Sequence, residues 1–439
     1  MNKSVVSIDL GSAFTKLGFR DGWNHTCALV NGGELCDAGN PFCIPSVVAR
    51  VKRGKSTHWQ IGQAAAQQVP GDDTEVFEDW KAGLFASLPS AKSEEVALRF
   101  FIELRRALEK STSFHFDSST PARICIPFLE TSERTGERLV NICREAGWQM
   151  SNERAVLFEP ESNVVGLTTW GKNQTGRVVG FEGGNLGIRM QAMFEKGPLQ
   201  EAYREGKEGG FGVCVMDIGA FTTDFAYLRF DTGHETSDWT KPEVKQHSVS
   251  LGVRDLSKAI TENLEGEIID LLALLPTSER DDRMRRLYHG QPSKLVRTSG
   301  GSVVLGTAAH MEIVEREIKH FAMQLFAERS EFRNSRIDEG PHPEYITGGG
   351  SMIPRLASVL EQKKSSELRR SFPRTTCHST DELLQIGEPA NPSQAEIHRR
   401  RGQDLKRGAS AIGGGSVFFE FGNQKRRRLI HNKYGARYE

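Results

Sequence analysis

The sequence predicts an α/β protein with a duplicated fold, in which two lobes face each other across a cleft. Two segments of the same type predict the duplication: Ile8–Thr15, near the N-terminus, and Met216–Asp224. Each follows a short β-branched run, carries an aspartate and then a glycine, and precedes a second strand-like run, which is the pattern of strand, tight turn and strand. The aspartates, Asp9 and Asp217, are 208 residues apart, so we assign one hairpin to each lobe.

Both turns offer the groups that bind a phosphate. Successive backbone N–H groups in a tight turn form a concave anion site, and the hydroxyls of Ser12 and Thr222 add donors. We expect the β- and γ-phosphates of a nucleotide to lie between the two turns. The predicted phosphate-binding residues are Gly11, Ser12, Ala13, Gly219, Ala220, Phe221 and Thr222.

A third glycine-rich segment, Glu344–Leu356, predicts the rest of the nucleotide site. It has the pattern of a strand end, a turn at Gly348, Gly349 and Gly350, and a helix that Ser351 caps. Pro354 would then lie in the first helical turn, where the missing N–H costs nothing. Backbone without side chains allows a flat ring to lie against the chain, so this turn predicts an adenosine site.

The order of these three segments resembles that of the actin, heat-shock chaperone and sugar kinase superfamily: phosphate 1, phosphate 2, adenosine. The segments Arg123–Pro127 and Val156–Gly166 are similar to the superfamily's strand and first connecting helix. The likeness is greatest to the ATPase domain of 70-kDa (DnaK-type) heat-shock chaperones, without the peptide-binding domain. The segments that carry it are Ile44–Ala49, Ile61–Ala65, Phe77–Lys81 and Ser250–Leu256. The resemblance implies a duplicated ribonuclease-H-like (actin-like) ATPase fold with bound ATP or ADP and Mg²⁺.

Four side chains are predicted to carry the chemistry. Asp9 and Asp217 would hold Mg²⁺ largely through water, because magnesium keeps most of its waters. The resemblance implies that Glu159 orients the attacking water, although a helix N-terminal carboxylate favoured by the macrodipole explains it too. Lys81 would neutralise charge on the γ-phosphate, or be a solvated surface lysine. Asp224 would touch magnesium or hold its own hairpin together.

The resemblance places adenine between the triple-glycine turn and a helix around Val314–His320. Glu315, Arg316 and Lys319 are its candidate ribose or ring contacts. An amphipathic helix with outward charges is the alternative explanation.

Four segments organise the chain. Residues 1–167 form lobe I with the first crossing helix, and residues 213–395 form lobe II with a predicted helix from Arg254 to Leu275. Residues 396–439 return to lobe I as a second crossing helix, expected over Gln394–Ile412, and end in a basic tail. Residues 168–212 are longer than an ordinary loop. They are interpreted as an insertion that is either tolerated or docks a protein partner or a second copy.

Composition excludes several classes of function. The 439 residues carry no net charge, so no global field attracts nucleic acid or a membrane. Seven cysteines without metal-ligand spacing predict reduced thiols, and no apolar run is long enough to cross a membrane. We therefore expect a cytoplasmic protein. From Glu396 onward eleven Lys or Arg oppose four acidic residues, which favours a solvated tail over a nucleic-acid contact.

The leading functional hypothesis is a chaperone-like, Mg-ATP-driven switch that regulates a protein partner and hydrolyses ATP slowly. An actin-like, filament-forming ATPase is the runner-up. A small-molecule kinase and an inactive pseudo-ATPase scaffold remain, because Phe221 replaces a glycine of the chaperone motif and narrows the second turn.

Overall fold

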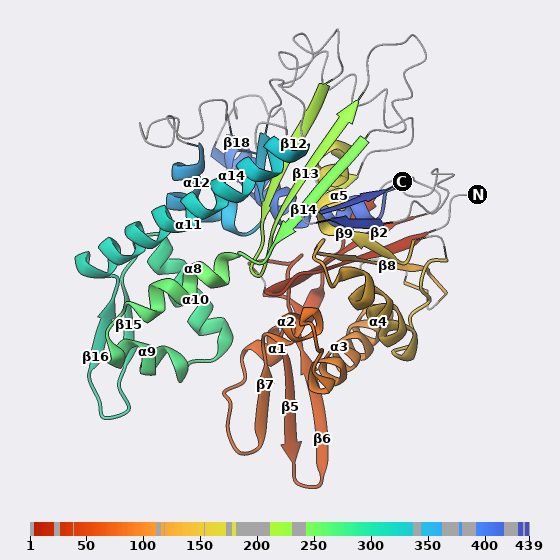
Figure 1. Ribbon diagram of the computed structural model, residues 1–439. Coiled ribbons are helices and arrows are strands. Elements are labelled where there is room, and N and C mark those ends of the chain that lie inside the picture. The colour runs from red at the N-terminus through yellow and green to blue at the C-terminus, as the bar shows by residue number, and fades with distance from the viewer. Residues whose placement is uncertain are drawn as a thin grey trace.

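The computed structural model is a mixed α/β protein with several sheets (Figure 1). The structure describes residues 4–21, 27–37, 39–110, 116–117, 119–152, 154–172, 178–180, 211–230, 243–336, 344–361, 377–379, 392–416, 429–432 and 435–438. Within these ranges no helix is both long and apolar enough to span a membrane.

The first large sheet has the strand order β10-β11-β3-β2-β1-β8-β9, with β4 paired to β2. Its central strands β1 and β8 are buried along their whole length, as is typical of strands covered on both faces. The predicted first hairpin is confirmed, since β1 and β2 pair antiparallel around the glycine turn. The strands are β1 (Val5–Leu10), β2 (Phe14–Arg20), β3 (Cys27–Leu29), β4 (Ile44–Pro45), β8 (Ala122–Ile126), β9 (Val156–Phe158), β10 (Trp170–Lys172) and β11 (Val178–Gly180).

The second large sheet has the order β14-β13-β12-β17-β18. Its pairings have the same senses as those of β3-β2-β1-β8-β9: two antiparallel pairs followed by two parallel pairs. The predicted second hairpin, β12–β13, is confirmed. The strands are β12 (Phe211–Ile218), β13 (Thr223–Phe230), β14 (Glu243–Val249), β17 (Glu344–Thr347) and β18 (Cys377–Ser379).

A smaller sheet, β6-β5-β7, the short helix η1 and helices α1 to α4 also belong to the described N-terminal half of the chain. Helix α3 repeats apolar residues at four-residue intervals (Val96, Phe100, Leu104 and Leu108), and this face is buried in one core with β1 and β8. The elements are η1 (Gly33–Leu35), β5 (Val48–Arg53), β6 (Ser56–Ile61), α1 (Gly62–Ala66), β7 (Thr74–Phe77), α2 (Trp80–Phe85), α3 (Ala91–Lys110) and α4 (Ser132–Glu145).

The C-terminal half has its own apolar core between the second sheet and helices α8 to α12. The single helix predicted from Arg254 to Leu275 is wrong, because α8 ends before Asn263 and α9 begins at Gly266. Glycine and asparagine are poor interior helix formers, and the turn between the helices buries Leu264. The elements are α8 (Val253–Glu262), α9 (Gly266–Ala273), α10 (Thr277–Tyr288), β15 (Ser293–Val296), β16 (Ser302–Leu305), α11 (Ala308–Arg336), η2 (Gly350–Met352) and α12 (Pro354–Glu361).

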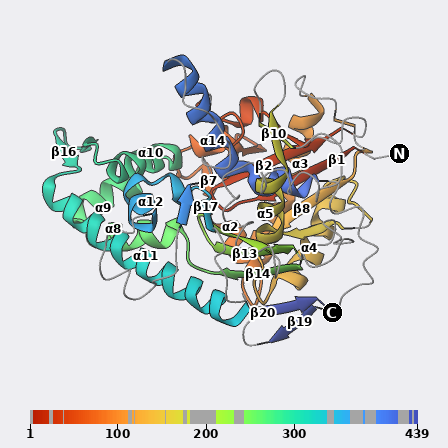
Figure 2. The ribbon, with the colours of Figure 1, turned by 90° about the horizontal axis from the view of Figure 1, so that it is seen from above.

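Two helices connect the halves. Helix α5 (Glu159–Thr169) follows β9 of the first sheet, but of the two large sheets it packs mainly on the second, at β12, β13 and β14. Helix α14 (Pro392–Gly414) comes from the C-terminal half and packs on β1, β2 and β3 (Figure 2). It includes the predicted crossing helix over Gln394–Ile412, so each large sheet is covered by a helix from the other half of the chain.

The two connecting helices pack against each other at glycines. A Cβ atom on Gly166 would lie 1.8 Å from the carbonyl oxygen of Ala409, and one on Gly413 would lie 1.7 Å from that of Ser162. Only glycine permits so close a backbone approach. The contact between α5 and α14 is thus fixed by residues that have no side chain.

The predicted insertion, residues 168–212, is placed only in part. Thr168 and Thr169 belong to α5, and β10 and β11 extend the first sheet by pairing with each other and with β3. Residues 181–210 lie outside the described residues, and so do residues 417–428 of the basic tail. After these, β19 (Leu429–Asn432) and β20 (Gly435–Tyr438) form a hairpin.

Candidate functional site

The first hairpin places Asp9 at the end of β1, directly opposite Lys16 on β2. The Lys16 Nζ lies 2.9 Å from the Asp9 Oδ2, and both side chains are largely buried. Burial alone would lower the pKa of Lys16, but the negative charge of Asp9 and weaker effects of Cys43 and Asp217 outweigh it and raise that pKa. This end of the hairpin therefore holds a fixed cation beside a carboxylate.

The second hairpin has the same register, with Asp217 opposite Asp224. The Asn163 Nδ2 on α5 donates to the Asp217 Oδ2 at 2.6 Å and to the Ser410 Oγ on α14 at 3.3 Å. One amide therefore ties the second hairpin to both connecting helices. The Asn163 Oδ1 is buried without a hydrogen-bond partner, so one acceptor remains for a ligand or water.

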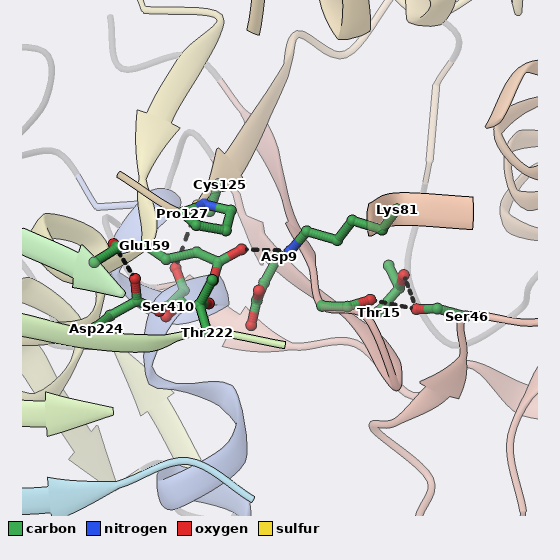
Figure 3. Close-up of polar contacts among 12 residues, drawn as sticks. Asp9, Thr15, Ser46, Lys81, Cys125, Pro127, Glu159, Thr222, Asp224 and Ser410 are labelled. Carbon is green, nitrogen blue, oxygen red and sulfur yellow. Dashed lines mark hydrogen bonds and ion pairs between the residues drawn. The ribbon is translucent and has the colours of Figure 1, made fainter. Parts of the chain in front are cut away.

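Lys81 and Glu159 meet in the space between the hairpins. The Lys81 Nζ on α2 lies 2.9 Å from the Glu159 Oε1 at the start of α5, and the two residues are 2% and 7% exposed. Figure 3 shows Lys81 extending toward Glu159, with Asp9 and Asp224 beside the pair. Lys81 is therefore part of a buried cluster and does not lie on the surface.

Asp224 is held by two hydroxyl donors. The Thr222 Oγ1 donates to its Oδ2 at 3.3 Å, and the Ser248 Oγ on β14 donates to its Oδ1. Ser248 in turn accepts the backbone N–H of Phe128 at 2.8 Å. These contacts give Asp224 the structural role within its own hairpin that the sequence left as one of two alternatives.

Four carboxyl groups and two lysines share this site. Burial raises the pKa of Asp217 to about 7, with Lys16 opposing the shift and Asp9 and Glu159 adding to it. Burial likewise raises the pKa of Glu159, against the attraction of Lys81. Burial and the charges of Glu159 and Asp217 raise the pKa of Asp224 well above its usual range. Burial thus disfavours the charged forms of three of the four carboxyl groups, and an added cation nearby would lower their pKa values.

The raised pKa of Asp217 predicts a pH-dependent gain in stability for Asp217→Asn. The folded protein binds this proton more tightly than the unfolded chain, so wild-type stability falls as pH rises from the ordinary aspartate pKa of 3.8 to about 7. The amide does not titrate, so we expect no gain below pH 4 and a gain on the order of a few kcal/mol above pH 7. Urea unfolding at pH 5 and pH 8 measures it. Exposed Asp72→Asn is the control. If Asp217→Asn changed the free energy of unfolding by the same amount at pH 5 and at pH 8, the raised pKa of Asp217 would be contradicted.

Both turns are too tight to accept a side chain at their glycines. A Cβ atom on Gly11 would lie 2.3 Å from the carbonyl oxygen of Phe14, and one on Gly219 would lie 2.8 Å from that of Thr222. The Ser12 Oγ is buried without a hydrogen-bond partner, which fits a hydroxyl that binds a phosphate oxygen. The Phe221 ring packs against the core of the N-terminal half.

The triple-glycine segment lies beside the second hairpin. Gly348 has φ +82°, and a Cβ atom there would lie 2.1 Å from the Asp217 Oδ1, so a side chain is excluded. Its N–H donates to the carbonyl oxygen of Lys406 on α14 at 2.8 Å. The predicted N-cap at Ser351 is wrong, because Ser351 lies inside η2 and its hydroxyl donates to the Gly348 carbonyl oxygen at 2.7 Å. Pro354 is the first residue of α12, as predicted.

The remaining adenosine candidates lie on α11. Glu315, Arg316 and Lys319 are exposed, and Glu315 forms an ion pair with Arg355 of α12. These contacts are those of an amphipathic helix with outward charges, the alternative that the sequence left open. Gly349 has open space where a side chain would be, so the turn leaves room for a flat ring.

Sequence reasoning missed Lys16, Asn163 and Ser248. Lys16 was detectable, because residues that flank a hairpin turn symmetrically lie opposite each other, and Lys16 is the partner of Asp9. Asn163 was partly detectable from its position one helical turn after Glu159, on the same side of α5. Nothing local to Ser248 indicated its contact with Asp224, which depends on the pairing of β13 with β14.

Within the described ranges, no three His, Cys, Asp or Glu side chains are grouped so that they could hold a metal ion. A magnesium ion between Asp9 and Asp217 would therefore take most of its ligands from water and phosphate, as Mg²⁺ usually does. No protein-family model matches this chain, and no curated protein matches it either.

Proposed function

We propose that the protein binds Mg-ATP between its two halves and hydrolyses it slowly, as a switch that controls the binding of a protein partner. The observation that carries the proposal is the pair of glycine hairpins with equal register, which brings Asp9 and Asp217 to one buried cluster with Lys16, Lys81 and Glu159. The equal pairing senses of the two large sheets support the duplicated, actin-like fold and the two lobes of this proposal.

Each residue has a role in the proposed site. The backbone N–H groups of Gly11–Ala13 and Gly219–Phe221 would bind the phosphates, and Ser12 would donate its hydroxyl. Lys16 adds positive charge, and Asp9 and Asp217 would hold magnesium through its waters. The ion supplies charge neutralisation of the phosphates. The glycines of the 348–350 turn would face the adenine.

Glu159 would act on the attacking water. Its raised pKa makes it a better proton acceptor than an ordinary glutamate, and its ion pair with Lys81 holds the carboxylate in place. Lys81 is also close enough to the hairpins to offset negative charge that develops during phosphoryl transfer. Glu159 is the one proposed base of the site, and we expect hydrolysis to be slow.

Binding of Mg-ATP by calorimetry tests the proposal. We expect wild-type protein to bind Mg-ATP, and Asp9→Asn to weaken binding about tenfold to a hundredfold, because one metal-holding carboxylate is lost and Lys16 loses its partner. Exposed Asp72→Asn is the matched control and should bind like wild type. Failure of the wild-type protein to bind Mg-ATP would refute the proposal.

The form of the switch needs a second measurement. Sedimentation velocity with and without Mg-ATP distinguishes a small discrete species, expected for a partner-regulated switch, from polymers that form only with ATP. Polymers would instead support the actin-like filament. Transfer of the γ-phosphate to a small molecule would favour a kinase, and binding without any hydrolysis would favour a pseudo-ATPase.

A further inference from the structure

The loop between β7 and α2 reaches across from the N-terminal half to the C-terminal half. The Glu78 carboxylate forms an ion pair with Arg280 of α10 and accepts a hydrogen bond from the Thr277 Oγ1 of the same helix. The next residue, Asp79, forms an ion pair with Arg254 at the start of α8. Figure 1 shows α10 facing α1 and β7 on this side of the molecule.

Arg254 is tied to both predicted phosphate-binding turns. Its backbone N–H donates to the carbonyl oxygen of Ala220 at 2.9 Å, and the adjacent Val253 N–H donates to that of Gly219 at 2.9 Å. The Arg254 Nη2 donates to the carbonyl oxygen of Ser12 at 3.2 Å. The backbone of this residue is thus fixed to the second turn, and its side chain is fixed to the first.

The same loop continues into the catalytic candidate on α2. Asp79 precedes α2, and Lys81 in the first turn of that helix pairs with Glu159. Displacement of Asp79 would therefore also move the lysine of the site. The contacts of Glu78, Asp79, Arg254, Thr277 and Arg280, here called the clasp, join the elements that would surround the phosphates.

We propose that the clasp holds the two halves together and that its opening limits the rate of nucleotide release. The inference rests on the proposed function, because it assigns regulation to the same site. Four of its contacts, Glu78–Arg280, Glu78–Thr277, Asp79–Arg254 and Arg254–Ser12, join residues of opposite halves, so parting the halves to free a nucleotide breaks these four together. Arg254 is a positioning residue in this scheme, since it acts on the phosphates through the two turns.

The clasp residues are partly exposed, so their ion pairs can open and close again. The Glu78 and Arg280 side chains are 26% and 31% exposed, and those of Asp79 and Arg254 are 66% and 34% exposed. Water can solvate such groups when they separate, so each pair adds only a modest barrier and is weakened by salt. We expect loss of one pair to accelerate nucleotide release about threefold to tenfold.

The first test needs no nucleotide. Spin labels on Lys55→Cys and Ser299→Cys, at the exposed tips of the β5–β6 and β15–β16 turns, report the distance between the halves. Glu78→Gln or Arg280→Ala should broaden this distance distribution toward longer values. The exchanged pair Glu78→Arg with Arg280→Glu should restore it. Arg286→Ala is the matched control, because Arg286 lies on the same helix and pairs with Asp282 of that helix.

The second test measures release of a fluorescent ATP analogue by stopped flow. Release should be faster in Glu78→Gln, Arg280→Ala and Arg254→Ala, near the wild-type rate in the exchanged pair, and unchanged in Arg286→Ala. Wild-type release should accelerate with ionic strength more than release from Arg280→Ala, which has fewer ion pairs to screen.

Two kinds of failure are distinguishable. If the wild-type protein binds the analogue and the clasp variants release it at the wild-type rate with unchanged label distances, the clasp proposal is refuted and the nucleotide site stands. If the wild-type protein binds no nucleotide, the proposed function is refuted, and so is the proposal that the clasp limits the rate of nucleotide release.

Discussion

Replacing Gly166 or Gly413 by alanine is expected to lower the free energy of unfolding by about 3 kcal/mol. The added Cβ would lie 1.8 Å from a backbone oxygen of α14 in the first case and 1.7 Å from one of α5 in the second. Backbone cannot rotate away as a side chain can, so the helices must separate along their contact. Urea unfolding of both variants measures the loss.

Gly266→Ala is the control for this experiment. Gly266 begins α9, has a negative φ and has nothing within 4 Å of an added Cβ. Alanine there should be neutral or stabilise by up to about 1 kcal/mol, because the unfolded chain loses freedom. Equal stabilities for Gly413→Ala and wild type would mean that the glycine contact between α5 and α14 is wrong.

Glu159→Gln is expected to reduce ATP hydrolysis about 100-fold or more, with Mg-ATP affinity within about threefold of wild type. The amide keeps the shape of the side chain and can still accept a hydrogen bond from Lys81, but it cannot take a proton from water. Single-turnover hydrolysis and calorimetric binding separate the two effects.

Glu161→Gln is the matched control for that substitution. Glu161 lies on the same helix, is equally buried and is also paired with a cation, Arg154, at 3.5 Å. In the described structure its ion pair is with Arg154, and it forms no ion pair with Lys81, so the hydrolysis rate of Glu161→Gln should stay within about threefold of wild type. Equal losses in both variants would indicate damage to α5 instead of a chemical role for Glu159.

The sequence was most informative where structure is local. A hairpin depends on its turn residues and on the two runs beside them, so the glycines after Asp9 and Asp217 were enough to predict β1–β2 and β12–β13 with their aspartates at the strand ends. The connecting helix over Gln394–Ile412 was predicted on a different ground, because a duplicated fold needs a second crossing back to lobe I.

The rest of the site depends on contacts between distant segments. The partners of Glu159 and Asp217 come from α2 and α5, and the sheet that brings them together is set by pairings more than a hundred residues apart. Ser351 illustrates the opposite error. Its residue type is typical of a cap, but the φ of Gly348 turns the chain so that Ser351 bonds backward to that glycine.

The exchange of α5 and α14 between the sheets has a consequence for folding. The hairpin β1–β2 is synthesised long before α14, the helix that covers it. During synthesis, the face of the first sheet that α14 covers therefore stays exposed to solvent until α14 has been made. This high contact order predicts slow folding with a late docking step, and exposure to aggregation until that step is complete.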